Sequence, residues 1–122
     1  QDARDAFTLA ADGFSGAYAL KIAKSGGPCG ALELAHVAQS AGIGLYGGTM
    51  LEGTIGTAAS LHAWATLPEM AWGTEMFGPL LMKDDIVAKP LHFHNNGVDL
   101  PQGPGLGIEI DEDKLARYRR KA

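Results

Sequence analysis

Three short apolar segments recur along the chain at a nearly constant interval, and helical patterns lie between them. The segments end at Lys21, Tyr46 and Thr74, which are 25 and 28 residues apart. A strand followed by a helix at this interval is the repeating unit of a parallel sheet, in which a helix makes each crossover. The spacing therefore predicts an α/β fold, either a doubly wound sheet or part of a closed (β/α)₈ barrel.

The residues around these segments predict where each element begins and ends. We expect helices over residues 2–11, 28–41 and 54–67, and strands over 17–22, 43–46 and 70–74. Pro28 suits the first position of a helix, and Pro68 stops the third helix. The run 17–22 is almost continuously apolar, a pattern typical of a strand that is buried on both faces.

The pattern changes after Pro79. Residues 86–93 and 98–100 alternate like strands around an Asn-Asn-Gly turn, and 108–110 is another strand candidate. Asp111 is positioned to cap a final helix over 112–120. We therefore divide the chain into a segment of repeating α/β units, 1–78, and an extended segment with a helix, 79–122.

Charge and cysteine usage exclude several classes of partner. The chain has 10 basic and 14 acidic residues and a formal net charge of −4, which argues against nucleic acid. The basic residues of 117–121 are expected to form the cationic last turn of a helix. Cys29 is the single cysteine, and no apolar stretch reaches the roughly 20 residues that span a bilayer. With no signal peptide in residues 1–5, we expect a cytoplasmic protein that contacts no membrane.

Two charged residues lie where a parallel sheet binds its ligands, at the carboxyl ends of strands. Lys21 ends the first strand, and Glu75 follows the third. Partial desolvation lowers the pKa of such a lysine and suits it to proton transfer, whereas a lysine that extends into solvent has no such role. Facing each other across a substrate, the two residues would serve as acid and base, and the glycines after Tyr46 would let backbone N–H groups approach a carboxylate. Spacing alone leaves both interpretations open.

His92 and His94 are two residues apart in an expected strand, so both imidazoles lie on the same face. This geometry is compatible with a metal ion. No third ligand is apparent near them in the sequence, and we therefore interpret them as exposed residues of a hairpin.

Three long segments resemble a known family. The sequences ALKIAKSGGP, LYGGTMLEGTIGT and WGTEMFGPLL are similar to the last three strand-end segments of the muconate cycloisomerases, which belong to the enolase superfamily. The similarity runs in order from about Asp2 to the final helix. It implies that residues 1–78 are the last three strands and helices of a TIM-type (β/α)₈ barrel, and that 79–122 returns to an α+β capping domain.

The resemblance also implies roles for individual residues. Lys21 matches a lysine that faces the substrate at the end of the sixth barrel strand, and Glu75 matches an acidic, proton-donating residue at the end of the eighth. Gly48, Thr49 and Met50 match a substrate-binding loop, and Phe77 matches an apolar wall near the ring.

The reaction implied by the resemblance is the reversible lactonization of cis,cis-muconate, a dicarboxylate, to muconolactone in the degradation of catechol. The family uses a divalent metal, manganese or alternatively magnesium, and forms homo-oligomers, typically octamers.

The family's metal ligands and its second-strand lysines have no counterparts in the chain. Three carboxylate ligands and a Lys-x-Lys pair are absent, so no metal ligand is assigned to this segment. A barrel needs roughly 250 residues, so we expect a C-terminal portion of an enzyme about three times as long, inactive without its N-terminal part.

Other interpretations of the sequence stay open. Chloromuconate cycloisomerases, o-succinylbenzoate synthases and dipeptide epimerases share the lysine, although Glu75 in the segment GTEMFGP favours the muconate group. A non-catalytic assembly module is an alternative from another class.

Overall fold

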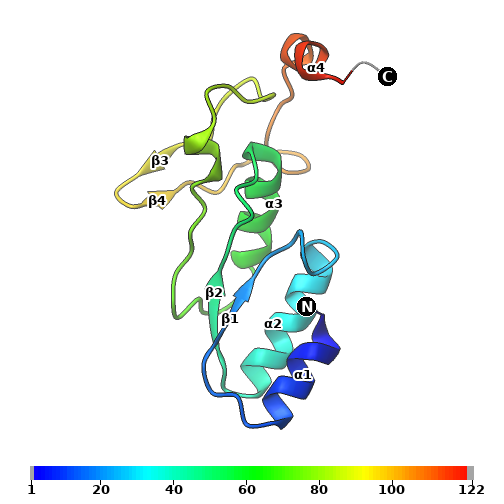
Figure 1. Cartoon of the computed structure of the whole chain (residues 1–122). Coiled ribbons are helices and arrows are strands. Elements are labelled where there is room, and N and C mark those ends of the chain that lie inside the picture. The colour runs from blue at the N-terminus through cyan, green and yellow to red at the C-terminus, as the bar shows by residue number, and fades with distance from the viewer. Residues whose placement is uncertain (1, 121–122) are drawn as a thin grey trace.

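The computed structural model describes residues 2–120, and its first half alternates helices and strands as the sequence predicts (Figure 1). The elements of this half are α1 (Ala3–Ala11), β1 (Ala17–Leu20), α2 (Pro28–Ser40), β2 (Gly44–Gly47) and α3 (Thr54–Trp64). The predicted helices are confirmed, although α3 ends three residues before the predicted limit, because residues 65–67 form a turn that closes on Ala63 and Trp64. No helix within residues 2–120 is long and apolar enough to cross a membrane.

β1 and β2 are parallel, with Ala17 opposite Gly44 and Leu20 opposite Gly47. The third predicted strand is reduced to one parallel bridge between Gly47 and Thr74. The prediction of a strand over 70–74 is therefore wrong in length. Residues 70–73 form a turn in which Gly73 N–H donates to the Met70 carbonyl, and Gly73 has the left-handed φ of 67°. The carboxyl ends of all three segments still lie side by side at the same end of the sheet.

The helices cover one face of these strands. α2 packs against both strands and against α1 and α3, and its buried residues are all alanines, which let the backbones approach closely. On the covered face lie Tyr18, Leu20 and Leu45, while Ala19 on the other face is exposed. The expectation that β1 is buried on both faces is therefore wrong for the described chain, because its helices lie on one side of the strands only.

The second half is mostly irregular, with the short elements η1 (Gly78–Leu81), β3 (Phe93–His94), β4 (Gly97–Val98) and α4 (Glu112–Tyr118). The predicted strand at 108–110 is present as a single antiparallel bridge between Val87 and Ile110. Asp111 caps α4 as predicted, because its carboxylate accepts from Lys114 N–H at 3.0 Å. The helix ends at Tyr118 rather than at residue 120, so Arg119 and Arg120 follow the helix instead of forming its last turn. Lys121, the last of the predicted cationic residues, lies outside the described residues.

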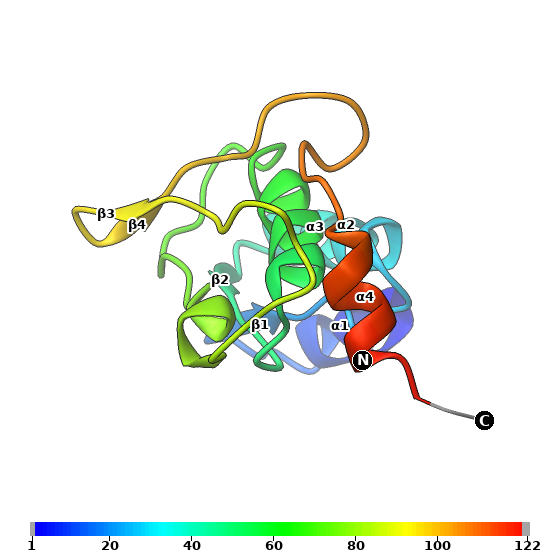
Figure 2. The same cartoon turned by 90° about the horizontal axis from the view of Figure 1, so that it is seen from above.

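The β3–β4 hairpin and α4 lie on opposite sides of α3 (Figure 2). Val98 of the hairpin packs against the main hydrophobic core, which connects the two halves. The division of the chain at residue 78 remains a prediction.

Candidate active site

Lys21 lies directly after β1, on the face that the helices leave open. Tyr18 and Leu20 point into the core, so the alternation of a strand places Ala19 and Lys21 on the opposite side. The half-buried Lys21 side chain lies against the backbone of Gly48, and a Cβ atom at Gly48 would collide with the Lys21 Nζ atom. Gly48 therefore leaves the space that the end of the Lys21 side chain occupies, and a larger residue there would displace the ammonium group.

Glu75 lies on the same open face. Its N–H donates to the Gly47 carbonyl at 2.9 Å, which continues the parallel pairing of Thr74 with Gly47. The alternation then places Glu75 on the side of Tyr46 and Lys21. One carboxylate oxygen, Oε1, accepts from Thr49 N–H at 3.2 Å. Lys21 and Glu75, the two charged residues predicted from the sequence, thus lie at the carboxyl ends of the strands and on the same face of the sheet.

Three neighbours keep Glu75 ionised. The Tyr46 hydroxyl donates a hydrogen bond to it and is the largest cause of its lowered pKa, followed by Thr49 N–H; the charge of Lys21 adds to them, and burial opposes them. The same hydrogen bond raises the pKa of Tyr46. The sequence predicts Tyr46 only as the end of a strand. Because side chains alternate along a strand, the same pattern could have placed Tyr46 on the face that carries Glu75.

The loop after β2 forms a second carboxylate site. Thr49 Oγ1 donates to Glu52 Oε2, and Met50 N–H donates to the same oxygen at 2.8 Å. Burial raises the pKa of Glu52, but the hydrogen bonds from Thr49 and Met50 and the charge of Lys21 outweigh it, so the pKa is lowered. The sequence places Glu52 in the loop just beyond the second strand, among the residues that could meet a ligand, but predicts no individual role for it.

These contacts change the expected task of the loop. The sequence predicts that its backbone N–H groups approach a bound carboxylate. In the structure the N–H groups of Thr49 and Met50 donate to Glu75 and Glu52 of the chain itself. A substrate carboxylate would have to compete with these two side chains.

Phe77 shares a depression with Glu75. The depression has a volume of about 590 Å³, and its other walls include Leu80 and the hairpin residues Phe93 and Val98. Phe77 is 39% exposed, so its ring is available to a ligand. Met50 is also exposed, at 48%, whereas Thr49 is buried.

The described residues do not form the carboxylate metal site that the resemblance implies. Within residues 2–120, the one group of three side chains that could hold a metal ion is His92, His94 and Asp99, which lies on the β3–β4 hairpin. The two carboxylates near Lys21 are each engaged by hydrogen bonds from the 49–50 loop. The donor set at the strand ends therefore does not fit such a metal.

The expectation that the histidine pair has no third ligand near in sequence is wrong. Asp99 follows His94 by five residues and contacts both imidazoles. The two-residue turn between the strands was the available signal, because it pairs His92 with Asp99 across the hairpin.

Comparisons with known proteins agree with this fold. The chain belongs to the enolase C-terminal domain-like family, whose profile matches residues 1–114. Its relatives within that family include the Muconate cycloisomerase 1 of Pseudomonas putida, which is 53% identical over 121 residues, covering 99% of this chain and 32% of the relative. The chloromuconate cycloisomerase CbnB of Cupriavidus necator is 44% identical over 117 residues, covering 96% and 32%.

Solved structures give the same result. The muconate lactonizing enzyme of Klebsiella pneumoniae superposes with a TM-score of 0.95 at 69% identity, covering 98% of this chain and 34% of that one. That of Pseudomonas fluorescens, complexed with muconolactone, superposes with a TM-score of 0.93 at 52% identity, covering 97% of this chain and 32% of that one. The predicted α/β fold and the resemblance are confirmed, and the chain spans about a third of the length of these relatives.

Proposed function

We propose that this chain is the C-terminal part of a muconate cycloisomerase, which interconverts cis,cis-muconate and muconolactone in the degradation of catechol. The observation that carries the proposal is the position of Lys21 and Glu75 on one open face of the sheet, in a chain that is 53% identical to a muconate cycloisomerase. The remaining two thirds of the enzyme would cover this face and complete the active site.

In the forward reaction one substrate carboxylate adds to the diene. A C–O bond forms, the π electrons move toward the other carboxylate as an enolate, and the carbon next to that carboxylate then takes up a proton. We assign delivery of this proton to the Lys21 ammonium, and its removal in the reverse reaction to the amine. Lys21 suits this task because it emerges on the open face beside the strand ends.

Glu75 is proposed to act as a carboxylate. The resemblance implies a proton-donating acid, but the hydrogen bond from Tyr46, the Thr49 N–H and the charge of Lys21 lower the pKa of Glu75. An ionised group holds the lysine cation in place and stabilises its charge, whereas it has no proton to give near neutral pH. Its role is therefore to position and balance Lys21.

The substrate-binding residues are proposed to be Gly48, Thr49, Met50 and Phe77. Gly48 leaves the space that the Lys21 side chain occupies. The loop N–H groups are donors of the kind that bind a substrate carboxylate, in competition with Glu52 and Glu75. The exposed ring of Phe77 offers an apolar surface to the diene.

The complete enzyme is proposed to use a divalent metal, manganese or magnesium, held by carboxylates outside the described residues. We further propose a cytoplasmic homo-oligomer, an octamer by resemblance. The free and exposed Cys29 supports a reducing compartment, and the many exposed apolar side chains support extensive contacts with the rest of the enzyme and with other subunits.

A chloromuconate cycloisomerase is the second candidate, because relatives of that activity are 44–45% identical to this chain. Parallel assays of the complete enzyme on muconate and on a chlorinated muconate separate the two. A higher kcat/KM for the chlorinated substrate would favour the second candidate.

The decisive experiment replaces each charged residue in the complete enzyme and follows the loss of muconate absorbance. Lys21→Met and Glu75→Gln are each expected to lower turnover by about 100-fold or more, which is the typical contribution of acid–base catalysis. Lys83→Met and Glu69→Gln are matched controls, since both side chains are exposed and neither lines the depression that holds Glu75 and Phe77. Near-normal turnover of both site variants would remove these residues from the mechanism.

A further inference from the structure

The β3–β4 hairpin brings two imidazoles and a carboxylate to one face. Phe93 pairs with Val98 and His94 with Gly97, and Asp99 N–H donates to the His92 carbonyl at 3.0 Å. Residues opposite each other in an antiparallel pair point to the same side. His92, His94 and Asp99 therefore share one face, while Phe93 and Val98 lie on the other.

The hairpin fixes this arrangement through its turn and its apolar face. Asn95 and Asn96 both have positive φ, 45° and 60°, which is the conformation of a two-residue type I′ turn. Gly97, opposite His94, has no side chain, so the imidazole leans diagonally toward Asp99 without obstruction. Val98 packs against the main core and holds the other face down.

One carboxylate bridges the two rings. His92 Nδ1 is 2.7 Å from Asp99 Oδ2, and His94 Nε2 is 2.7 Å from Asp99 Oδ1. The rings are stacked with centroids 4.9 Å apart, and the three potential ligand atoms lie within 4.8 Å of one another. Ligand atoms about 2.1 Å from a tetrahedral ion are about 3.4 Å apart, so small side-chain rotations would accommodate one ion.

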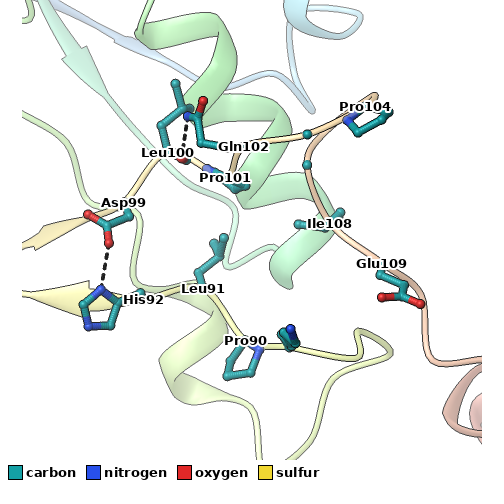
Figure 3. A pocket seen from close by; sticks show the side chains of 13 residues that line it. Pro90, Leu91, His92, Asp99, Leu100, Pro101, Gln102, Pro104, Ile108 and Glu109 are labelled. Atoms are coloured by element: carbon teal, nitrogen blue, oxygen red, sulfur yellow. Dashed lines mark hydrogen bonds and ion pairs between the residues drawn. The ribbon is translucent and has the colours of Figure 1, made fainter.

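The donors and their setting suit a transition metal. Each imidazole offers a ring nitrogen and Asp99 offers a carboxylate oxygen, which are ligand types that zinc takes in proteins. All three side chains are exposed, which leaves the remaining coordination positions open to water. His92 and Asp99 also line the edge of a depression of about 560 Å³ that includes Pro101 and Ile108 (Figure 3).

We propose that His92, His94 and Asp99 form a second metal site, which binds a divalent transition-metal ion such as zinc. Two imidazoles and one carboxylate suit Zn²⁺, Ni²⁺ and Cu²⁺, whereas Mg²⁺ and Mn²⁺ favour sites made of oxygen atoms. Its two imidazole ligands distinguish it in metal preference from the carboxylate metal site of the proposed reaction. It does not depend on that reaction.

Zinc titration of the complete enzyme tests the site. The enzyme is freed of metal by chelation, saturated with Mn²⁺ to fill the oxygen site, and titrated with ZnCl₂ by calorimetry. We expect one additional zinc ion per subunit. The double variant His92→Ala/His94→Ala is expected to bind it more than about 100-fold more weakly, because loss of a mere outer-shell partner already costs 10- to 100-fold.

A control and a spectroscopic readout make the result specific. His36→Ala, which removes an exposed histidine of α2, is expected to bind zinc like the wild type. Co²⁺ in place of Zn²⁺ is expected to give visible absorption bands that are lost in Asp99→Asn. Circular dichroism of the metal-free variants checks that the fold is intact. Absence of the additional zinc ion in the wild type, or its equal binding by the double variant, would overturn the proposal.

Discussion

The charge of Glu75 depends on the Tyr46 hydroxyl more than on any other neighbour. This single contact distinguishes two roles for the glutamate. If Glu75 acts as a carboxylate, a low pKa keeps it active over a wide pH range. If it acts as an acid, the same low pKa removes the proton it would donate. The role can therefore be read from the direction in which activity changes with pH.

Tyr46→Phe in the complete enzyme is predicted to raise the pKa of Glu75, because it removes the largest cause of the lowered value. The acid limb of the kcat/KM profile should then move to higher pH, while activity near neutral pH changes little. Tyr118→Phe is the matched control, since its hydroxyl donates to Asp84 at 2.9 Å, far along the chain from the site. An unmoved acid limb, or higher activity of Tyr46→Phe at neutral pH, would contradict the carboxylate role.

For individual residues, the sequence predicted where a side chain lies in the sheet better than which side chains it contacts. Lys21 and Glu75 could be placed at strand ends because a parallel repeat aligns its carboxyl edges. The contacts of Glu75 with Tyr46 and Thr49 depend on which face each side chain takes, and this follows only from the register. Asp99 meets the two imidazoles only across the hairpin, so the spacing of residues along one strand does not reveal it as a third ligand.

Among the elements, α3 depends on a residue far along the chain for its N-terminal cap. Its N-cap position is Gly53, which has no side chain, and Thr54 N–H donates instead to Asp85 Oδ2 at 2.7 Å. The other oxygen of Asp85 accepts from Ile86 N–H at 2.7 Å. The extended second half therefore stabilises the helix that follows β2.

Asp85→Ala is predicted to lower the free energy of unfolding of the complete protein by about 1 kcal/mol, the typical value of a helix cap. Burial raises the pKa of Asp85, but the hydrogen bonds from Thr54 and Ile86 outweigh it, so the folded-state pKa lies below its ordinary value of 3.8. The contribution is fully present above pH 3.8 and is lost as the pH falls through the folded-state pKa.

Urea unfolding at several pH values measures this difference. The gap between wild type and Asp85→Ala should be constant near neutral pH and should shrink in acid. Asp113→Ala, in the exposed first turn of α4, is the control and should change stability by no more than about 0.5 kcal/mol. An equal loss in both variants would show that the Asp85 cap is not responsible.

The helices of this fold could be predicted because their signals are local: apolar periodicity, Pro28 at a start and glycine near an end. The third strand could not, because Gly73 takes a left-handed conformation and Met70 begins a turn. Likewise, the pairing of Val87 with Ile110 joins segments 23 residues apart in the sequence and leaves no local signal.

At the scale of the whole molecule, the described chain leaves large apolar side chains uncovered. Trp72 is 68% exposed, Leu80 62% and Leu81 61%, and the face of β1 that carries Ala19 has no helix over it. Apolar surface of this kind is normally covered by another segment or subunit. The short parallel pair β1–β2 also has an unpaired edge, which favours association with other chains.

The 122-residue chain expressed by itself is therefore predicted to aggregate or to unfold without a cooperative transition, since its open face and exposed apolar residues would contact other copies. Size-exclusion chromatography and thermal unfolding measure both properties, and the complete protein, in which these surfaces are expected to be covered, is the control. Co-expression with the remaining part of the enzyme should restore a soluble complex. A monodisperse species of 12.8 kDa with a sharp unfolding transition would instead favour the non-catalytic assembly module, because the segment would then close a core of its own.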